Sequence, residues 1–138
     1  MSVFDRRRLL VALLRLGGGV TVTAFLAMLL PVEWMAAAHR WLGLGEFPQS
    51  AVVDYLARSV AALYGFHGIL LFIVAHDPDR FAAIVRYIAF MNIALGVLLM
   101  AIDAHAGLPW WWTWGEGPPI IAFGIVVILL SGRTTTRR

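Results

Sequence analysis

Four long apolar stretches, each free of charged residues, alternate with short polar connections along the chain. They cover residues 16–32, 59–75, 87–102 and 118–132. An α-helix needs about 20 apolar residues to cross the hydrocarbon core of a bilayer, so each helix must extend past its flanking charges. The pattern predicts an all-α integral membrane protein, a four-transmembrane-helix bundle forming one domain over residues 1–138. We expect its spans at residues 10–32, 51–75, 79–104 and 111–131.

The composition agrees with this class of protein. Hydrophobic residues make up 61% of the 138 residues and charged residues only 14%, which excludes a soluble globular domain. The first stretch follows three arginines, as a secretory signal does, but it is longer than the apolar core of about 7–15 residues in a cleavable signal. It is therefore interpreted as a retained helix, in which Gly17, Gly18 and Gly19 permit close packing against a neighbouring helix.

The connections between the spans also carry structural signals. Apolar residues recur at helical spacing within residues 33–49, which predicts a short helix in the membrane interface, ended by Pro48. Asp77 and Pro78 are typical of an N-cap and first helical position, so spans two and three should form a tight antiparallel hairpin. The fourth helix either begins at Pro118 or begins near Trp111 and bends at the double proline; the longer helix is favoured because it can cross the membrane.

The arginines indicate the orientation. All eleven basic residues are arginine, and nine of them flank the spans on the side that holds both termini: Arg6, Arg7, Arg8, Arg15, Arg80, Arg86, Arg133, Arg137 and Arg138. Only Arg40 and Arg58 fall on the other side. The positive-inside rule then places both termini in the cytoplasm. The arginines that give the net charge of +3 are explained by membrane orientation and by contacts with lipid headgroups. No nucleic-acid partner is therefore expected.

All six tryptophans fall on the opposite, extracytoplasmic side. They are Trp34, Trp41, Trp110, Trp111, Trp112 and Trp114. Two interpretations apply: an aromatic belt at the lipid headgroups, or a docking surface for another membrane protein or a flat ligand.

Polar residues within the spans are the default candidates for function. Counted from the turns, Arg58 lies at nearly the same depth as Glu116, with Asp103 slightly further out. The sequence predicts a buried charge cluster in which Glu116 is the first partner of Arg58, and Asp103 or Asp54 the second. The cluster is either a structural clasp between helices or a site for a proton, an ion or a polar headgroup.

His67 and Asn92 fall near the middle of the second and third spans. A hydrogen bond between them is one use; a quinone-carbonyl or pigment ligand is the other. A bilayer haem needs two histidines at matched depth, and His39, His76 and His105 fall near the surfaces. The chain has no cysteine, and its acids and histidines lack metal-site spacing. We therefore expect no metal, no catalytic residues and no intrinsic enzyme activity, with His67 and Asn92 as the only cofactor-site candidates.

Several residues in order resemble the DoxX-like superfamily of small four-helix bacterial membrane proteins. They are the stretch 62–68 (ALYGFHG), residues 77–81 (DPDRF), Asn92, Gly96, Asp103, residues 107–109 (GLP) and Glu116. The resemblance covers about residues 50–131. It implies a four-helix bundle in a bacterial inner membrane and an association with electron-transfer complexes, and it supplies no catalytic residues.

Two functions fit these observations. The first is a non-catalytic accessory or assembly subunit of a larger respiratory or photosynthetic membrane complex, bound to lipid and to another membrane protein. The alternative is a small quinone-associated redox subunit or small-molecule carrier that uses His67 and the cluster of Arg58 and Glu116.

Overall fold

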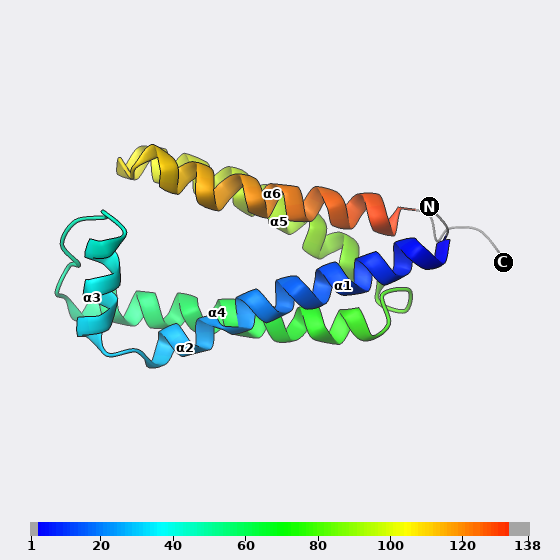
Figure 1. The fold of residues 1–138 in the computed structure, drawn as a ribbon, viewed down its shortest axis with the longest axis horizontal. Helices are drawn as coiled ribbons and strands as arrows, with labels where there is room; N and C mark the ends of the chain where they lie inside the picture. Colours follow the sequence, from blue (N-terminus) through cyan, green and yellow to red (C-terminus); the bar gives the residue numbers. More distant parts are fainter. Residues whose placement is uncertain (1–2, 133–138) are drawn as a thin grey trace. The chain divides into compact units, whose positions relative to one another are not determined.

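A computed structural model describes residues 3–132 of the chain, with side chains from Phe4 onward. Within that range the secondary structure is entirely helical (Figure 1). The helices are α1 (Val3–Val22), α2 (Ala24–Leu29), α3 (Val32–Trp41), α4 (Ala51–His76), α5 (Ala82–Ala106) and α6 (Trp110–Ser131). Four segments are long and apolar enough to cross a membrane: Phe4–Leu29, α4, α5 and α6. This confirms the all-α class and the four predicted spans of a multi-pass membrane protein.

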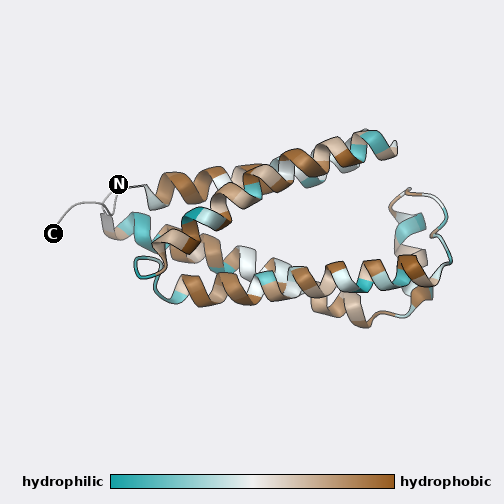
Figure 2. Cartoon of the chain, turned by 180° about the vertical axis from the view of Figure 1, so that it is seen from behind, coloured by the Kyte–Doolittle hydropathy of each residue, from teal (hydrophilic) through white to brown (hydrophobic). Residues whose placement is uncertain are grey.

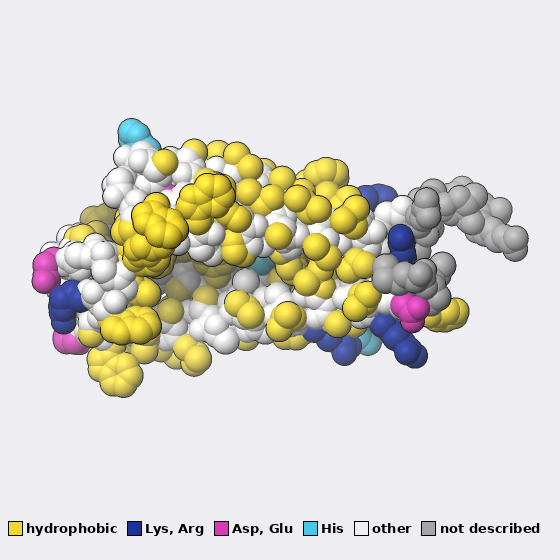
Figure 3. All heavy atoms as spheres, turned by 45° about the horizontal axis from the view of Figure 1, so that its top comes forward, with side chains coloured by type: hydrophobic (Ala, Val, Ile, Leu, Met, Phe, Trp, Pro, Cys, Tyr) yellow, Lys and Arg dark blue, Asp and Glu magenta, His cyan; other side chains and the backbone are white. Residues whose placement is uncertain are grey.

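The helix surfaces are apolar, as a bilayer requires. Hydrophobic residues continue along α4, α5 and α6 (Figure 2), and hydrophobic side chains cover much of the face seen in Figure 3. Leu63, Phe66 and Phe90 are each more than 60% exposed. Exposed apolar surface of this extent would promote aggregation in water, whereas lipid chains cover it in a membrane.

The chain divides into two compact units. The α5–α6 unit comprises residues 1–14 and 73–138, and the α3–α4 unit comprises residues 15–72. The arrangement of all four spans in one domain stays a prediction. Arg133, Arg137 and Arg138, which contribute to the predicted orientation, lie outside the described residues.

In the α3–α4 unit, glycines bring α1 and α4 into backbone contact. A Cβ atom placed on Gly68 would lie 2.8 Å from the carbonyl oxygen of Gly18 and 2.6 Å from the amide nitrogen of Val22. Only glycine permits such an approach. The rings of Phe25 and Phe66 then pack edge to face, with centroids 5.3 Å apart. The close packing expected from the glycine run is thereby confirmed at Gly18.

The first span differs from its predicted limits of residues 10–32. It begins at Val3, is interrupted at Thr23 and ends at Leu29. The hydroxyl of Thr23 donates to the Val20 carbonyl oxygen at 2.6 Å, a bond that competes with regular helical pairing. Leu30 is extended, with ψ 140°, because Pro31 follows and disfavours a helical conformation at the preceding residue.

The short helix of the following segment also ends earlier than predicted. α3 stops at Trp41 rather than near Pro48. Gly43 and Gly45 adopt positive φ angles of 68° and 88°, which turn the chain out of the helix, and residues 42–50 are irregular. The placement of α3 in a membrane interface stays a prediction.

In the α5–α6 unit, α5 and α6 run side by side as antiparallel neighbours (Figure 1). Ala89, Gly96 and Asp103 are buried at seven-residue intervals along α5, a spacing typical of coiled-coil packing. On α6, a Cβ atom at Gly117 would lie 2.9 Å from the Gly96 carbonyl oxygen, and one at Gly124 would lie 2.5 Å from that of Ala89. Small residues therefore set the separation of the two helices.

The ends of α5 and α6 test two further predictions. α6 begins at Trp110 and contains both Pro118 and Pro119, so the longer of the two predicted helices is confirmed. α5 begins at Ala82, three residues after the approximate start expected for the third span, so the prediction that Asp77 and Pro78 are its N-cap and first helical residue is wrong. The Asp77 side chain does accept from the Arg80 N–H, at 3.4 Å, but it closes a separate turn over residues 77–81.

Candidate functional site

Arg58 makes three hydrogen bonds within the α3–α4 unit. Its Nε donates to Asp54 Oδ1, one helical turn away, at 2.9 Å. Its Nη1 donates to the Met28 carbonyl oxygen at 2.5 Å and its Nη2 to that of Leu30 at 3.2 Å. The last carbonyls of a helix lack intrahelical donors, and a cation there also matches the helix dipole. Arg58 thus holds the end of α2 against α4.

This role of Arg58 was missed by the sequence reasoning, which looked for a carboxylate partner. The signal was Pro31, because a proline marks a helix end whose carbonyl groups need donors. Of the three predicted acids, only Asp54 lies in the same unit as Arg58. The pairing of Arg58 with Glu116 or Asp103 joins the two units and stays a prediction.

Asp103 and Glu116 form a pair of carboxylates in the α5–α6 unit. Asp103, near the end of α5, is only 4% exposed, and its Oδ2 has no hydrogen-bond partner among the described residues. Glu116, on α6, interacts electrostatically with Asp103 and accepts from the indole Nε1 of Trp112 at 3.0 Å. A buried carboxylate oxygen without a donor is costly. The pair is therefore suited to bind a cation or a hydrogen-bond donor.

His67 and Asn92 lie in different units, so their predicted hydrogen bond is untested. Asn92 is buried on α5, and its side-chain Nδ2 donates to the Ile88 carbonyl oxygen at 2.8 Å. This bond satisfies one of the two amide protons of the side chain. His67 is half-buried on α4. A role for either residue toward a quinone or pigment stays a prediction.

The tryptophans differ in their exposure. Trp110 and Trp114 on α6 are 75% and 62% exposed, and Trp111 is 37% exposed. Trp34 and Trp41 on α3 are exposed as well. Trp112 differs from the others because its indole N–H is used by Glu116. The five exposed rings suit either of the two predicted uses, the aromatic belt or the docking surface.

Arg7 joins the start of α1 to the turn between α4 and α5. Its Nε lies 2.9 Å from Asp79 Oδ2, and its Nη2 lies 3.8 Å from Asp77 Oδ1. All three residues belong to the α5–α6 unit. The sequence alone indicates Arg7 as an orientation signal and as an anchor to lipid headgroups. The structure adds a clasp between the chain's first helix and this turn.

Among residues 3–132, the structure contains no group of three or more histidine and acidic side chains that could hold a metal ion. Comparisons with protein-family models, with curated proteins and with solved structures find no match to this chain. The resemblance to the DoxX-like superfamily consequently stays a prediction.

Proposed function

We propose that this chain is a non-catalytic accessory or assembly subunit of a larger membrane complex in the bacterial inner membrane, with both termini in the cytoplasm. The observation that carries the proposal is an unpartnered small-residue position on α6, Gly115, beside exposed tryptophans. A small residue in a membrane helix is useful where another helix approaches closely. At Gly115 that other helix would belong to a partner.

Most other helical glycines of the described chain differ from Gly115, although a Cβ atom placed on Gly19 of α1 would also meet nothing within 4 Å. Each of Gly18, Gly68, Gly96, Gly117 and Gly124 is in close contact with a neighbouring helix. A Cβ atom placed on Gly115 would meet nothing within 4 Å. Glycine weakens an isolated helix by about 1 kcal/mol relative to alanine, a cost that helix packing offsets where another helix is in contact. Within the α5–α6 unit, no described residue provides that compensation at Gly115.

The side chains around Gly115 suit recognition by another protein. Trp111 precedes Gly115 by four residues and so lies on the same face of α6, and Trp114 neighbours Trp111 three residues on. Tryptophan supplies a large contact area with few rotatable bonds, and it is enriched in binding hot spots. The resemblance to the DoxX-like superfamily adds support for an electron-transfer complex as the partner assembly.

The experiment is native extraction. A tagged chain expressed from its own locus is solubilised in mild detergent and examined by blue-native electrophoresis and mass spectrometry. We expect an assembly larger than a homo-oligomer, with a second integral membrane protein in fixed stoichiometry. If the chain migrated alone, or only with copies of itself, after cross-linking in intact membranes, the proposal would be wrong.

A second candidate function, a small quinone-associated redox subunit or small-molecule carrier, is favoured by Asp103 Oδ2, which is buried and has no hydrogen-bond partner among the described residues. Its test is the variant His67→Gln, since glutamine can still donate and accept a hydrogen bond. If His67 only forms a hydrogen bond between helices, the substitution should lower the free energy of unfolding by ~0.6 kcal/mol. Loss of a bound quinone or chromophore from an otherwise folded His67→Gln protein would instead support this second function.

A further inference from the structure

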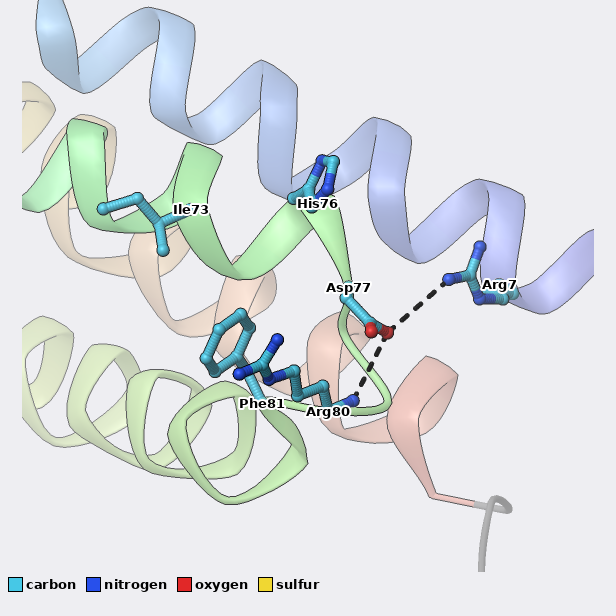
Figure 4. Close-up of a pocket in the computed structure, with 6 residues that line it drawn as sticks. All are labelled: Arg7, Ile73, His76, Asp77, Arg80 and Phe81. Carbon is cyan, nitrogen blue, oxygen red and sulfur yellow. Dashed lines mark hydrogen bonds and ion pairs between the residues drawn. The ribbon is translucent and has the colours of Figure 1, made fainter.

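A pocket of about 550 Å³ opens at the turn between α4 and α5, within the α5–α6 unit. Its lining residues are Arg7, Ile73, His76, Asp77, Arg80 and Phe81 (Figure 4). The volume lies within the ~300–1,000 Å³ typical of small-ligand sites. α4 ends and α5 begins on either side of this turn, and both helices are membrane-span candidates. The pocket therefore lies at the end of two spans, at the level expected for lipid headgroups.

Asp77, the acidic residue that lines the pocket, is only weakly paired. Arg7 makes its short contact, 2.9 Å, with Asp79, so the charge of Arg7 is matched by that acid. Among the described residues, the contacts of the Asp77 carboxylate are longer: 3.8 Å to Arg7 Nη2 and 3.4 Å to the Arg80 backbone N–H (Figure 4). The Asp77 side chain is 43% exposed. Its carboxylate can therefore accept further hydrogen bonds from a ligand.

The basic side of the pocket carries an arginine without an ion-pair partner in the described part of the chain. The guanidinium carbon of Arg80 lies 5.6 Å from the centre of the Phe81 ring, and Figure 4 shows the two side chains next to each other. Stacking on an aromatic ring positions a guanidinium while leaving its N–H groups free along the edge. Such a fork fits the oxygens of a phosphate group.

We propose that this pocket binds the headgroup of a zwitterionic aminophospholipid, with its phosphate diester at Arg80 and its primary ammonium at Asp77. Two arginines and two aspartates meet at the turn, and Arg7 already pairs with Asp79. A zwitterionic ligand would pair its phosphate with Arg80 and its ammonium with Asp77, so that no charge is left unmatched. A headgroup that lacks an amine, such as that of phosphatidylglycerol, would place no cation near Asp77. The juxtaposition of one unpaired cation and one loosely held anion is complementary to a zwitterion.

The apolar wall of the pocket identifies the ligand as a lipid rather than a soluble phosphate ester. Ile73 lies one helical turn before the end of α4 and is 51% exposed, and Phe81 adds its ring. From Ile73 the exposed apolar surface continues along α4 through Phe72 and Ile69. Acyl chains can cover this surface, which a free headgroup cannot do.

The test is native mass spectrometry of the full chain in detergent, titrated with equal amounts of phosphatidylethanolamine and phosphatidylglycerol. We expect one bound phosphatidylethanolamine, favoured about tenfold over phosphatidylglycerol. Arg80→Gln should weaken binding of both lipids about tenfold. Asp77→Asn should remove the preference or reverse it, because the asparagine side chain no longer attracts the ammonium. Arg86→Gln is the matched control: it removes an exposed arginine that does not line the pocket.

Several outcomes would overturn the proposal. If Arg86→Gln weakened binding as much as Arg80→Gln, the effect would belong to the basic surface as a whole. If the unmodified chain preferred phosphatidylglycerol, the zwitterion assignment would be wrong. If millimolar phosphoethanolamine displaced the lipid, the ligand would be a soluble ester. A thermal melt of each variant shows whether it is folded. If Arg80→Gln unfolds, Arg80→Lys replaces it as the test, because lysine keeps the charge but lacks the forked guanidinium. Folded Arg80→Lys protein should bind the lipid about threefold more weakly.

Discussion

Arg58 and Asp54 lie one turn apart on α4, and the guanidinium that pairs with Asp54 at 2.9 Å also donates to two carbonyl oxygens at the end of α2. The ion pair is partly exposed, at 32% for Arg58 and 36% for Asp54, so it contributes little by itself. The hydrogen bonds to Met28 and Leu30 carry more of the stabilisation. Without Arg58, these carbonyl groups would be left without donors.

The first prediction follows from that difference. Arg58→Ala should destabilise the protein by about 2–4 kcal/mol, because it removes one carboxylate contact and two charge-assisted bonds to carbonyl groups. Asp54→Ala should cost less than 1 kcal/mol, roughly the worth of an exposed ion pair. Thermal melts in detergent measure both.

A double-mutant cycle of Arg58 with Glu116 also tests the predicted pairing, since a coupling larger than that with Asp54 would make Glu116 the first partner.

The second prediction concerns the crossing of α1 and α4. Gly68→Ala would place a Cβ atom against backbone atoms of α1, which cannot rotate away, so we expect a loss of about 1–3 kcal/mol. Gly19→Ala is the matched control, because a Cβ there meets nothing within 4 Å. It should be neutral or stabilise the helix by up to about 1 kcal/mol. Equal losses from both substitutions would contradict the assigned crossing.

The third prediction concerns the carboxylate pair. Asp103→Asn keeps the shape of the side chain but replaces a buried carboxyl group whose Oδ2 has no hydrogen-bond partner among the described residues and which interacts with Glu116. We expect the variant to be more stable by about 1–2 kcal/mol in a detergent melt. A loss of stability instead would mean that the native carboxylate is satisfied by a bound cation or by a donor from elsewhere.

The fourth prediction concerns orientation. The chain lacks cysteine, so single cysteines report position cleanly. Glu46→Cys, in the exposed loop after α3, should react with an impermeant thiol reagent on intact cells. Cysteines at Ser2 and Thr135, which lie outside the described residues, should react only after the cells are opened. Labelling in the reverse pattern would place both termini outside the cytoplasm.

The sequence was sufficient to predict the helices, because crossing a bilayer imposes long apolar runs that few other structures need. The residues at which the helices begin and end were harder to predict. The break at Thr23 and the end of α3 before Gly43 depend on local hydrogen bonding and positive φ angles, which hydrophobicity does not record. The start of α6 at Trp110 could be chosen correctly because a helix from Pro118 would be too short to span.

The candidate site was harder to predict than the fold. Asp54 was expected near Arg58 from its spacing of four residues, which fixes neighbours on a helix. The carbonyl groups of Met28 and Leu30 could not be found from residue types, because every residue has a carbonyl and only the end of a helix leaves it free. The clasp between Arg7 and Asp79 joins residues 72 positions apart, a separation at which sequence spacing carries no geometric information.

The most direct test of the proposed accessory role is the variant Gly115→Leu, examined in native membranes by blue-native electrophoresis. Leucine should fill the open position on α6 and exclude a partner helix, so the large assembly should be lost. The purified chain should keep its thermal stability or gain up to about 1 kcal/mol from the better helix former. Ala94→Leu, which adds similar bulk at an exposed position of α5, should leave the assembly intact. An assembly that survives Gly115→Leu unchanged would contradict the proposed docking face and, with it, the observation on which the accessory role rests.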